Sequence, residues 1–142
     1  MPGLYKGESV NDKQKLFDLQ LTDKQLGQLK DHLERLDKQL TEVVGMRKAL
    51  EEFKELDGQE ELKVPITSGI FASATLTSSK TVGVNVGNGV VVDKTIDQAI
   101  GMISSQLSQM AQYREQVLEQ FNQLIQKAEG LAKDIQTEEG HV

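Results

Sequence analysis

A stripe of apolar side chains, spaced alternately three and four residues apart, constrains the fold of this chain more than any other feature. The stripe runs through residues 96–135 with Arg114 as its one interruption, and a shorter stripe runs through residues 26–50, interrupted by Arg47. This spacing is the a/d rhythm of a coiled coil. Because so narrow a stripe is unstable in water without a partner helix, we expect the two helices to pack against each other antiparallel.

The charge within the longer stripe needs a partner. Arg114 occupies a position that the stripe would otherwise fill with an apolar side chain, and an uncompensated buried charge is costly. In an antiparallel arrangement Arg114 falls near Asp37 and Glu34, which could neutralise it.

Local signals predict where the first helix begins and ends. Thr22 and Gln25 form a T-x-x-Q capping box, which is typical of a helix N-terminus. Asp57-Gly58 predicts the end, since glycine adopts the left-handed cap conformation at no steric cost. We therefore expect helix over about residues 23–56, within an N-terminal segment of residues 12–57.

The second helix has comparable signals. Thr95 and Gln98 form another capping box, and the stripe behind it predicts helix over residues 95–136. Gly130 could end this helix early or only weaken it. The outermost residues, 1–11 and 137–142, are expected to be flexible tails.

The segment between the helices changes to a period of two. Residues 62–94 are rich in Val, Ile, Thr and Gly and contain few charges. Such alternation of β-branched residues predicts strands, and breaks at 67–69, 78–80 and 87–89 divide the segment into four short strands in two hairpins. The last break contains Asn-Gly, the favoured pair for a tight hairpin turn. The fold class expected is α+β, with the two hairpins at the base of a long antiparallel coiled coil.

Two short hairpins cannot bury their own apolar residues. A lone hairpin is marginal in water, and apolar strand edges pair readily with other chains. We therefore expect the strands to join those of other subunits in an intersubunit β-barrel; the alternative is a small sheet folded onto the base of its own coiled coil. The residues expected at this assembly surface are Ile70, Ala72, Ala74, Leu76, Val82, Val84, Val86, Val90 and Val92.

Composition and motifs exclude several classes of function. The net charge of −6 argues against nucleic acid as a partner. The chain has no cysteine, which excludes disulfides and cysteine-ligated metal. The glycines of residues 83–89 lack the spacing of phosphate-binding loops, and no nucleophile lies beside a base, so we expect no enzyme activity, cofactor or metal. With no membrane span or signal peptide in the sequence, we expect a cytoplasmic protein.

The centre of the chain resembles the alpha class of the prefoldin family. Residues 62–71, LKVPITSGIF, resemble the first-hairpin stretch, in which a Val-Pro pair introduces small residues and then an apolar strand. Residues 82–95, VGVNVGNGVVVDKT, resemble the second hairpin and its exit into the following helix, and residues 97–100, DQAI, resemble the start of that helix. The resemblance covers about residues 20–135 of a single prefoldin-like domain spanning residues 1–142.

The resemblance implies a function and partners. Prefoldins are hexamers with a double β-barrel base and six coiled coils, in which alpha-class subunits assemble with beta-class subunits. They hold non-native client proteins without ATP and deliver them to a group II chaperonin. The alternative function is a structural or tethering coiled-coil subunit of a prefoldin-like complex without client activity.

Apolar residues near the far ends of the two helices are candidates for client contact, because holding an unfolded protein needs exposed apolar surface. They lie before the first capping box and beyond Gly130. Alternatively they extend the coiled coil by two turns, and Leu19 has the register for that. The candidates are Leu16, Phe17, Leu19, Leu21, Leu131 and Ile135.

Overall fold

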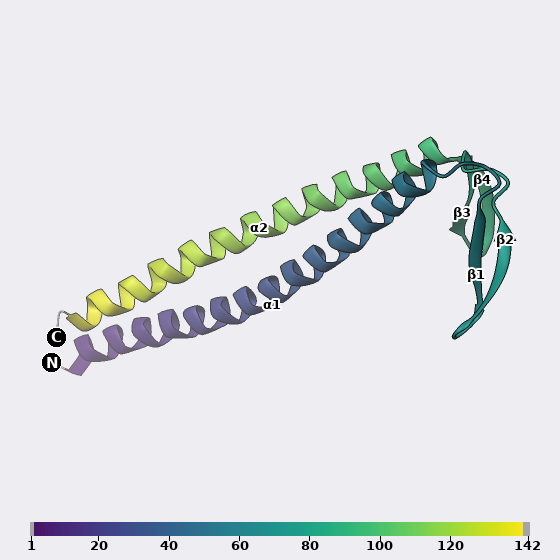
Figure 1. The fold of residues 1–142 in the computed structure, drawn as a ribbon. Helices are drawn as coiled ribbons and strands as arrows, with labels where there is room; N and C mark the ends of the chain where they lie inside the picture. The colour runs from purple at the N-terminus through teal and green to yellow at the C-terminus, as the bar shows by residue number, and fades with distance from the viewer. Residues whose placement is uncertain (1, 141–142) are drawn as a thin grey trace. The chain divides into compact units, whose positions relative to one another are not determined.

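The fold consists of two long helices separated by two β-hairpins, in a computed structural model that describes the backbone of residues 2–140 and the side chains of residues 12–136 (Figure 1). The elements in chain order are α1 (Pro2–Lys54), β1 (Glu61–Thr67), β2 (Ile70–Thr75), β3 (Thr81–Gly87), β4 (Val90–Thr95) and α2 (Ile96–Gly140). The predicted α+β class and the predicted order of helix, two hairpins and helix are confirmed.

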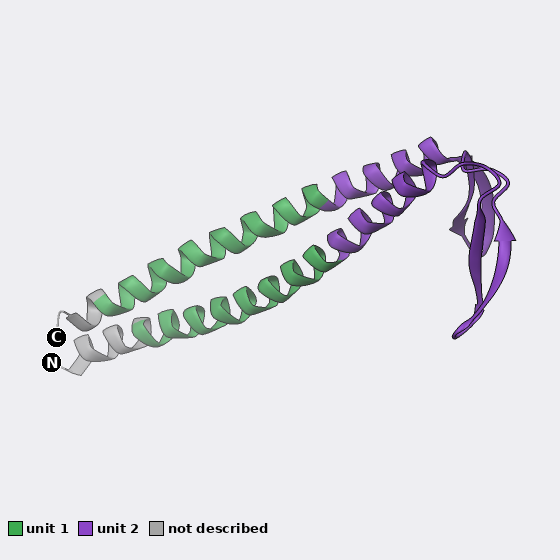
Figure 2. Ribbon diagram, viewed as in Figure 1, with its two compact units in different colours: residues 1–38, 111–142 green, residues 39–110 purple. Residues whose placement is uncertain are grey.

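The chain divides into two compact units (Figure 2). The first consists of Met1–Lys38 and Ala111–Val142, and the second consists of Gln39–Met110. Each unit contains a stretch of α1 lying antiparallel to a stretch of α2, and the second unit also contains both hairpins.

The first unit is held together by the predicted apolar stripes, whose facing positions we call the seam. Leu33, Leu36 and Val117 are buried in the seam, and Leu29, Leu118 and Phe121 pack around them. Leu118 does not belong to the predicted stripe; it widens the apolar face of α2 beyond strict a/d spacing.

In the second unit the seam continues to the beginning of α2. The buried side chains of this unit are Val43, Ile96 and Leu107 of the stripes and Ala99, which lies beside the stripe of α2. The capping box at the start of α2 is confirmed: the Gln98 backbone N–H donates to Thr95 Oγ1 at 3.1 Å, and the Thr95 N–H donates to Gln98 Oε1 at 3.1 Å. Two N–H groups that the helix itself cannot satisfy are thereby bonded.

The predicted start of the first helix is wrong. Thr22 lies inside α1, which begins at Pro2, so residues 2–11 belong to the helix rather than to a separate tail. The Thr22 hydroxyl donates to the Asp18 carbonyl oxygen at 2.7 Å, four residues earlier, and Thr22 is only 1% exposed. Residues 8–26 contain neither glycine nor proline, so nothing stops the helix from continuing past the capping motif.

The predicted helix ends also differ. α1 ends at Lys54, and Gln59 rather than Gly58 adopts the left-handed conformation, with a φ of 78°. The Gln59 N–H donates to the Leu76 carbonyl oxygen at 2.7 Å, so this conformation leads the chain into the first hairpin. Gly130 interrupts nothing, because α2 continues to Gly140.

The strands form two separate antiparallel sheets of two strands each, which we call hairpin 1 (β1 and β2) and hairpin 2 (β3 and β4). The turn of hairpin 2 has the predicted form: Asn88 has a φ of 51° and Gly89 a φ of 74°. Both residues are therefore left-handed, as the favoured two-residue hairpin turn requires.

Candidate protein-interaction surfaces

Hairpin 1 presents an apolar face built from both of its strands. Leu62 pairs with Ala74 and Val64 with Ala72, and paired residues project on the same side of an antiparallel sheet. Ala72, Ala74 and the following Leu76 are partly buried, whereas Ile70 is exposed. The expected assembly residues of this hairpin therefore include both partly buried and exposed side chains.

Three exposed apolar residues of hairpin 1 were not among the predicted ones. Val64, Ile66 and Phe71 all leave much of their surface in water, and Ile66 is 69% exposed. Phe71 pairs with Pro65 on the side opposite to Val64. The alternation of the sequence indicates two faces, but it does not tell which of them has a partner.

Hairpin 2 has a similar apolar face. Val84 pairs with Val92 and Val82 with Lys94, so these four side chains project on one side. Val82 and Val84 are partly buried, whereas the other predicted assembly residues, Val86, Val90 and Val92, are exposed. On the opposite side Val91, which the sequence analysis missed, is 63% exposed.

Strand pairing leaves open edges. Ladder hydrogen bonds join β1 to β2 and β3 to β4, and no strand of hairpin 1 is paired with a strand of hairpin 2. Each hairpin, on described residues, thus combines exposed apolar side chains with strand edges able to receive another strand.

The six candidate client-contact residues divide into two groups within the first unit. Leu16, Phe17 and Leu21 of α1 are 47%, 63% and 45% exposed, and Phe17 and Leu21 are neighbours one turn apart. The other three candidates are partly buried and continue the seam: Leu19, Leu131 and Ile135.

Polar contacts also join the two helices of the first unit. Arg114 Nε donates to Asp37 Oδ1 at 2.5 Å, so Asp37, one of the two acidic residues expected near Arg114, is its partner. The hydrogen bond and the attraction of the Asp37 charge raise the pKa of Arg114. On the same unit His32 Nε2 lies 2.9 Å from the Tyr113 hydroxyl.

An ion pair also joins the helices of the second unit. Lys54 Nζ lies 2.8 Å from Asp97 Oδ1, linking the last residue of α1 to the first turn of α2. The hydrogen bond to Asp97 and its charge raise the pKa of Lys54 above its usual 10.5. A carboxylate in the first turn of a helix also complements the helix dipole.

The described residues contain no group of three or more His, Cys, Asp or Glu side chains that could hold a metal ion. In the same part of the chain, neither helix combines the length and apolarity needed to cross a membrane. One groove of the first unit, of about 700 Å³, is lined by four glutamine amides together with Leu29, His32, Leu124 and Lys127. This chemistry suits contact with other polypeptides.

Comparison with known proteins identifies the family. The family model described as "Prefoldin subunit" matches residues 22–140. The chain belongs to the prefoldin family. The alpha-class resemblance of the sequence is confirmed, because the curated relatives are named as alpha subunits.

Three curated relatives, each named "Prefoldin subunit alpha", illustrate the similarity. The proteins of Methanopyrus kandleri and Methanothrix thermoacetophila are 33% and 36% identical, over 56% and 66% of this prefoldin. These two matches span only 50% and 57% of the relatives' own length. The Pyrococcus horikoshii protein is 27% identical over 89% of this chain and 78% of its own.

A solved structure supports the fold. The filamentous PFD of Methanocaldococcus jannaschii superimposes with a TM-score of 0.68, covering 81% of this chain and 95% of that one. The two sequences are 19% identical, so the likeness concerns the arrangement of helices and hairpins.

Proposed function

We propose that this chain is an alpha-class subunit of an ATP-independent holdase, assembled with beta-class subunits into a hetero-hexamer in the cytoplasm. The observation that carries the proposal is the state of the hairpins: each is a separate two-stranded sheet with exposed apolar side chains. Since such hairpins are marginal alone, strands of neighbouring subunits would complete them. Closure into an intersubunit β-barrel would remove the open edges.

In the proposed function, non-native clients bind to exposed apolar residues of α1. Leu16, Phe17 and Leu21 support this role because their side chains are exposed to solvent although α1 is paired with α2 in this unit. A small apolar patch binds weakly, so several subunits would hold one client together through avidity. The clients would then pass to a group II chaperonin without ATP hydrolysis by this chain.

The rival function is a structural or tethering subunit without client activity. The observation that favours it is the partial burial of Leu19, Leu131 and Ile135, which extends the seam and makes these three residues part of the coiled coil.

One experiment tests assembly and holding together. The chain is mixed with the beta-class subunit of the same organism, the mass of the product is measured, and the product is added to a chemically denatured protein diluted into buffer. We expect the mass of a hexamer and suppression of aggregation, measured by light scattering. A hexamer that left aggregation unchanged would favour the structural role, and a stable monomer would contradict the proposal.

Paired variants then locate the client surface. Phe17→Ser with Leu21→Ser is expected to weaken the suppression of aggregation several-fold while the hexamer mass is retained. The control is Val44→Ser with Met46→Ser, which removes side chains of similar exposure, 46% and 51%, from the other unit's part of α1. Equal effects of the two variants would contradict a specific role for Phe17 and Leu21.

A further inference from the structure

After its first two residues, α2 begins with a long uncharged stretch, one side of which is exposed. From Gln98 to Tyr113 no side chain carries a charge, whereas a stretch of this length would carry about four at the chain's average of 27% charged residues. The part of α1 in the same unit is charged in the ordinary way. Its charged residues are Glu42, Arg47, Lys48, Glu51, Glu52 and Lys54.

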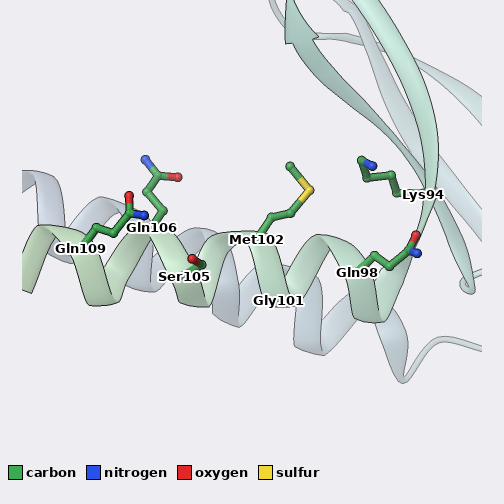
Figure 3. A pocket seen from close by; sticks show the side chains of 7 residues that line it. All are labelled: Lys94, Gln98, Gly101, Met102, Ser105, Gln106 and Gln109. Atoms are coloured by element: carbon green, nitrogen blue, oxygen red, sulfur yellow. The ribbon is translucent and has the colours of Figure 1, made fainter.

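Some of the exposed residues of this stretch form one continuous side of α2. Gln98, Gly101, Met102, Ser105 and Gln109 recur at helical spacing, and all are exposed. Together with Lys94 of β4 they line a groove of about 600 Å³. Figure 3 shows these side chains along the helix, with Met102 standing away from the backbone and Lys94 near the start of α2.

This groove meets a second one at Met102. The second groove, of about 370 Å³, lies between hairpin 2 and the helices of the same unit, with Val82 and Val84 on one wall and Ala99 and Ile103 on the other. Met102, which is 44% exposed, belongs to both. The outer side of α2 is therefore continuous with the apolar face of hairpin 2.

We infer that the uncharged side of α2, from Gln98 to Gln109, is an extension of the subunit-assembly surface and receives the apolar face of a β-hairpin from a neighbouring prefoldin subunit. Interface cores are depleted in charge and enriched in Met. Gly101 and Ser105 allow a neighbouring backbone to approach closely, and the Gln amides can both donate and accept hydrogen bonds at the margin. This inference rests on the proposed function, which supplies the neighbouring subunit.

The composition of this side of α2 favours binding of one defined partner rather than of many different unfolded clients. Met102 is its one large exposed apolar side chain among small residues and amides. Such a surface gains affinity from shape matching and directed hydrogen bonds, which a single defined hairpin satisfies and unfolded chains of many sequences do not. Its continuity with Val82 and Val84, residues of the expected assembly surface, points to the same partner.

Charge insertion tests the inference. Two variants are compared, Ser105→Lys with Gln109→Lys and Ser105→Glu with Gln109→Glu, because burial disfavours an unpaired charge of either sign. Lys and Glu are at least as good helix formers as Ser and Gln, so α2 itself should be unharmed. The control is Asn122→Lys with Gln126→Lys, which places two charges at the same spacing on exposed positions in the other unit's part of α2.

The readout is the dissociation constant of the hexamer with its beta-class partner, measured by mass photometry across a dilution series. Both charge variants are expected to raise it at least tenfold, with the control within twofold of wild type and helix content by circular dichroism unchanged. Wild-type assembly by both variants would overturn the inference, as would normal assembly with lost suppression of aggregation, because the surface would then bind clients. If wild type itself forms no hexamer, the proposed function fails first, which separates the two outcomes.

Discussion

A Cβ on Gly83 would lie 2.9 Å from Val91 Cγ1 across hairpin 2. Gly83 pairs with Asp93 and Asn85 pairs with Val91, so Val91 is the diagonal neighbour of Gly83 on the same side of the sheet. The distance is shorter than carbon atoms adopt in favourable packing, and Val91 cannot turn away freely because its χ1 angle is restricted. Glycine at position 83 has no Cβ and therefore leaves room for the Val91 side chain.

Gly83→Ala is therefore expected to lower the free energy of unfolding by about 1 kcal/mol, the usual cost of overpacking. Urea unfolding followed by circular dichroism measures it. In a Val91→Ala background the same substitution should cost much less, because the contact is gone. An equal loss in both backgrounds would show that the Val91 contact is not the cause.

Thr22→Val distinguishes a helix cap from a residue in the middle of a helix. Thr22 is buried and its hydroxyl bonds the carbonyl of Asp18, a local contact that slightly destabilises helices. We expect the variant to be more stable by about 0.5 kcal/mol, since a methyl group replaces a buried hydroxyl. Loss of a true N-cap would instead cost about 1 kcal/mol. Thr95→Val, at a true cap, serves as the control and should show that loss.

The Lys54–Asp97 ion pair predicts a stability loss at alkaline pH. Its hydrogen bond and charge raise the pKa of Lys54 above 10.5 in the folded state. The stabilisation is therefore complete below the unfolded-state pKa and disappears as the pH rises through the folded-state value. We expect the urea midpoint of wild type to fall more steeply above about pH 10.5 than that of Lys54→Met. Parallel curves for the two proteins would contradict the assignment, and the effect should shrink in high salt.

The turn of hairpin 2 predicts an asymmetric response to substitution. Gly89 has a φ of 74°, a conformation that is strained for residues with a Cβ, so Gly89→Ala should lower the free energy of unfolding by about 1 kcal/mol. Asn88→Gly should be close to neutral, because glycine also accepts the φ of 51° at that position. Equal losses for both variants in a urea titration would show that the turn conformation is not the determinant.

The two capping motifs show why part of the fold was predictable and part was not. Thr95 and Gln98 follow a strand, so the helix must begin there, and the motif forms its reciprocal hydrogen bonds. Thr22 and Gln25 have the same spacing, but the residues before them are helix-compatible and Leu19 continues the stripe. A capping motif thus predicts a helix start only where the preceding residues cannot be helical.

The interaction surfaces were predicted less completely than the elements. The alternation of residue types with a period of two predicted where the strands lie. The pairing of β3 with β4 in the structure then places Val82 and Val84 on the same side of hairpin 2. Exposed Phe71 and Val91 belong to the other side, which alternation alone treats as solvent-facing. The uncharged side of α2 was not predicted. The apolar stripe on the opposite side of the helix, which forms the seam, accounts for the helical periodicity of the sequence. The single-domain organisation over residues 1–142 stays a prediction.

The separate pairing of each hairpin has a consequence for the order of folding. Every ladder in the sheets joins residues close in sequence, such as Leu62 with Ala74, whereas the helix pairing joins His32 to Tyr113, 81 positions apart. Short loops close quickly and long ones slowly. During synthesis both hairpins can therefore take shape before most of α2 exists, and the helices come together last, beginning from the end nearest the hairpins.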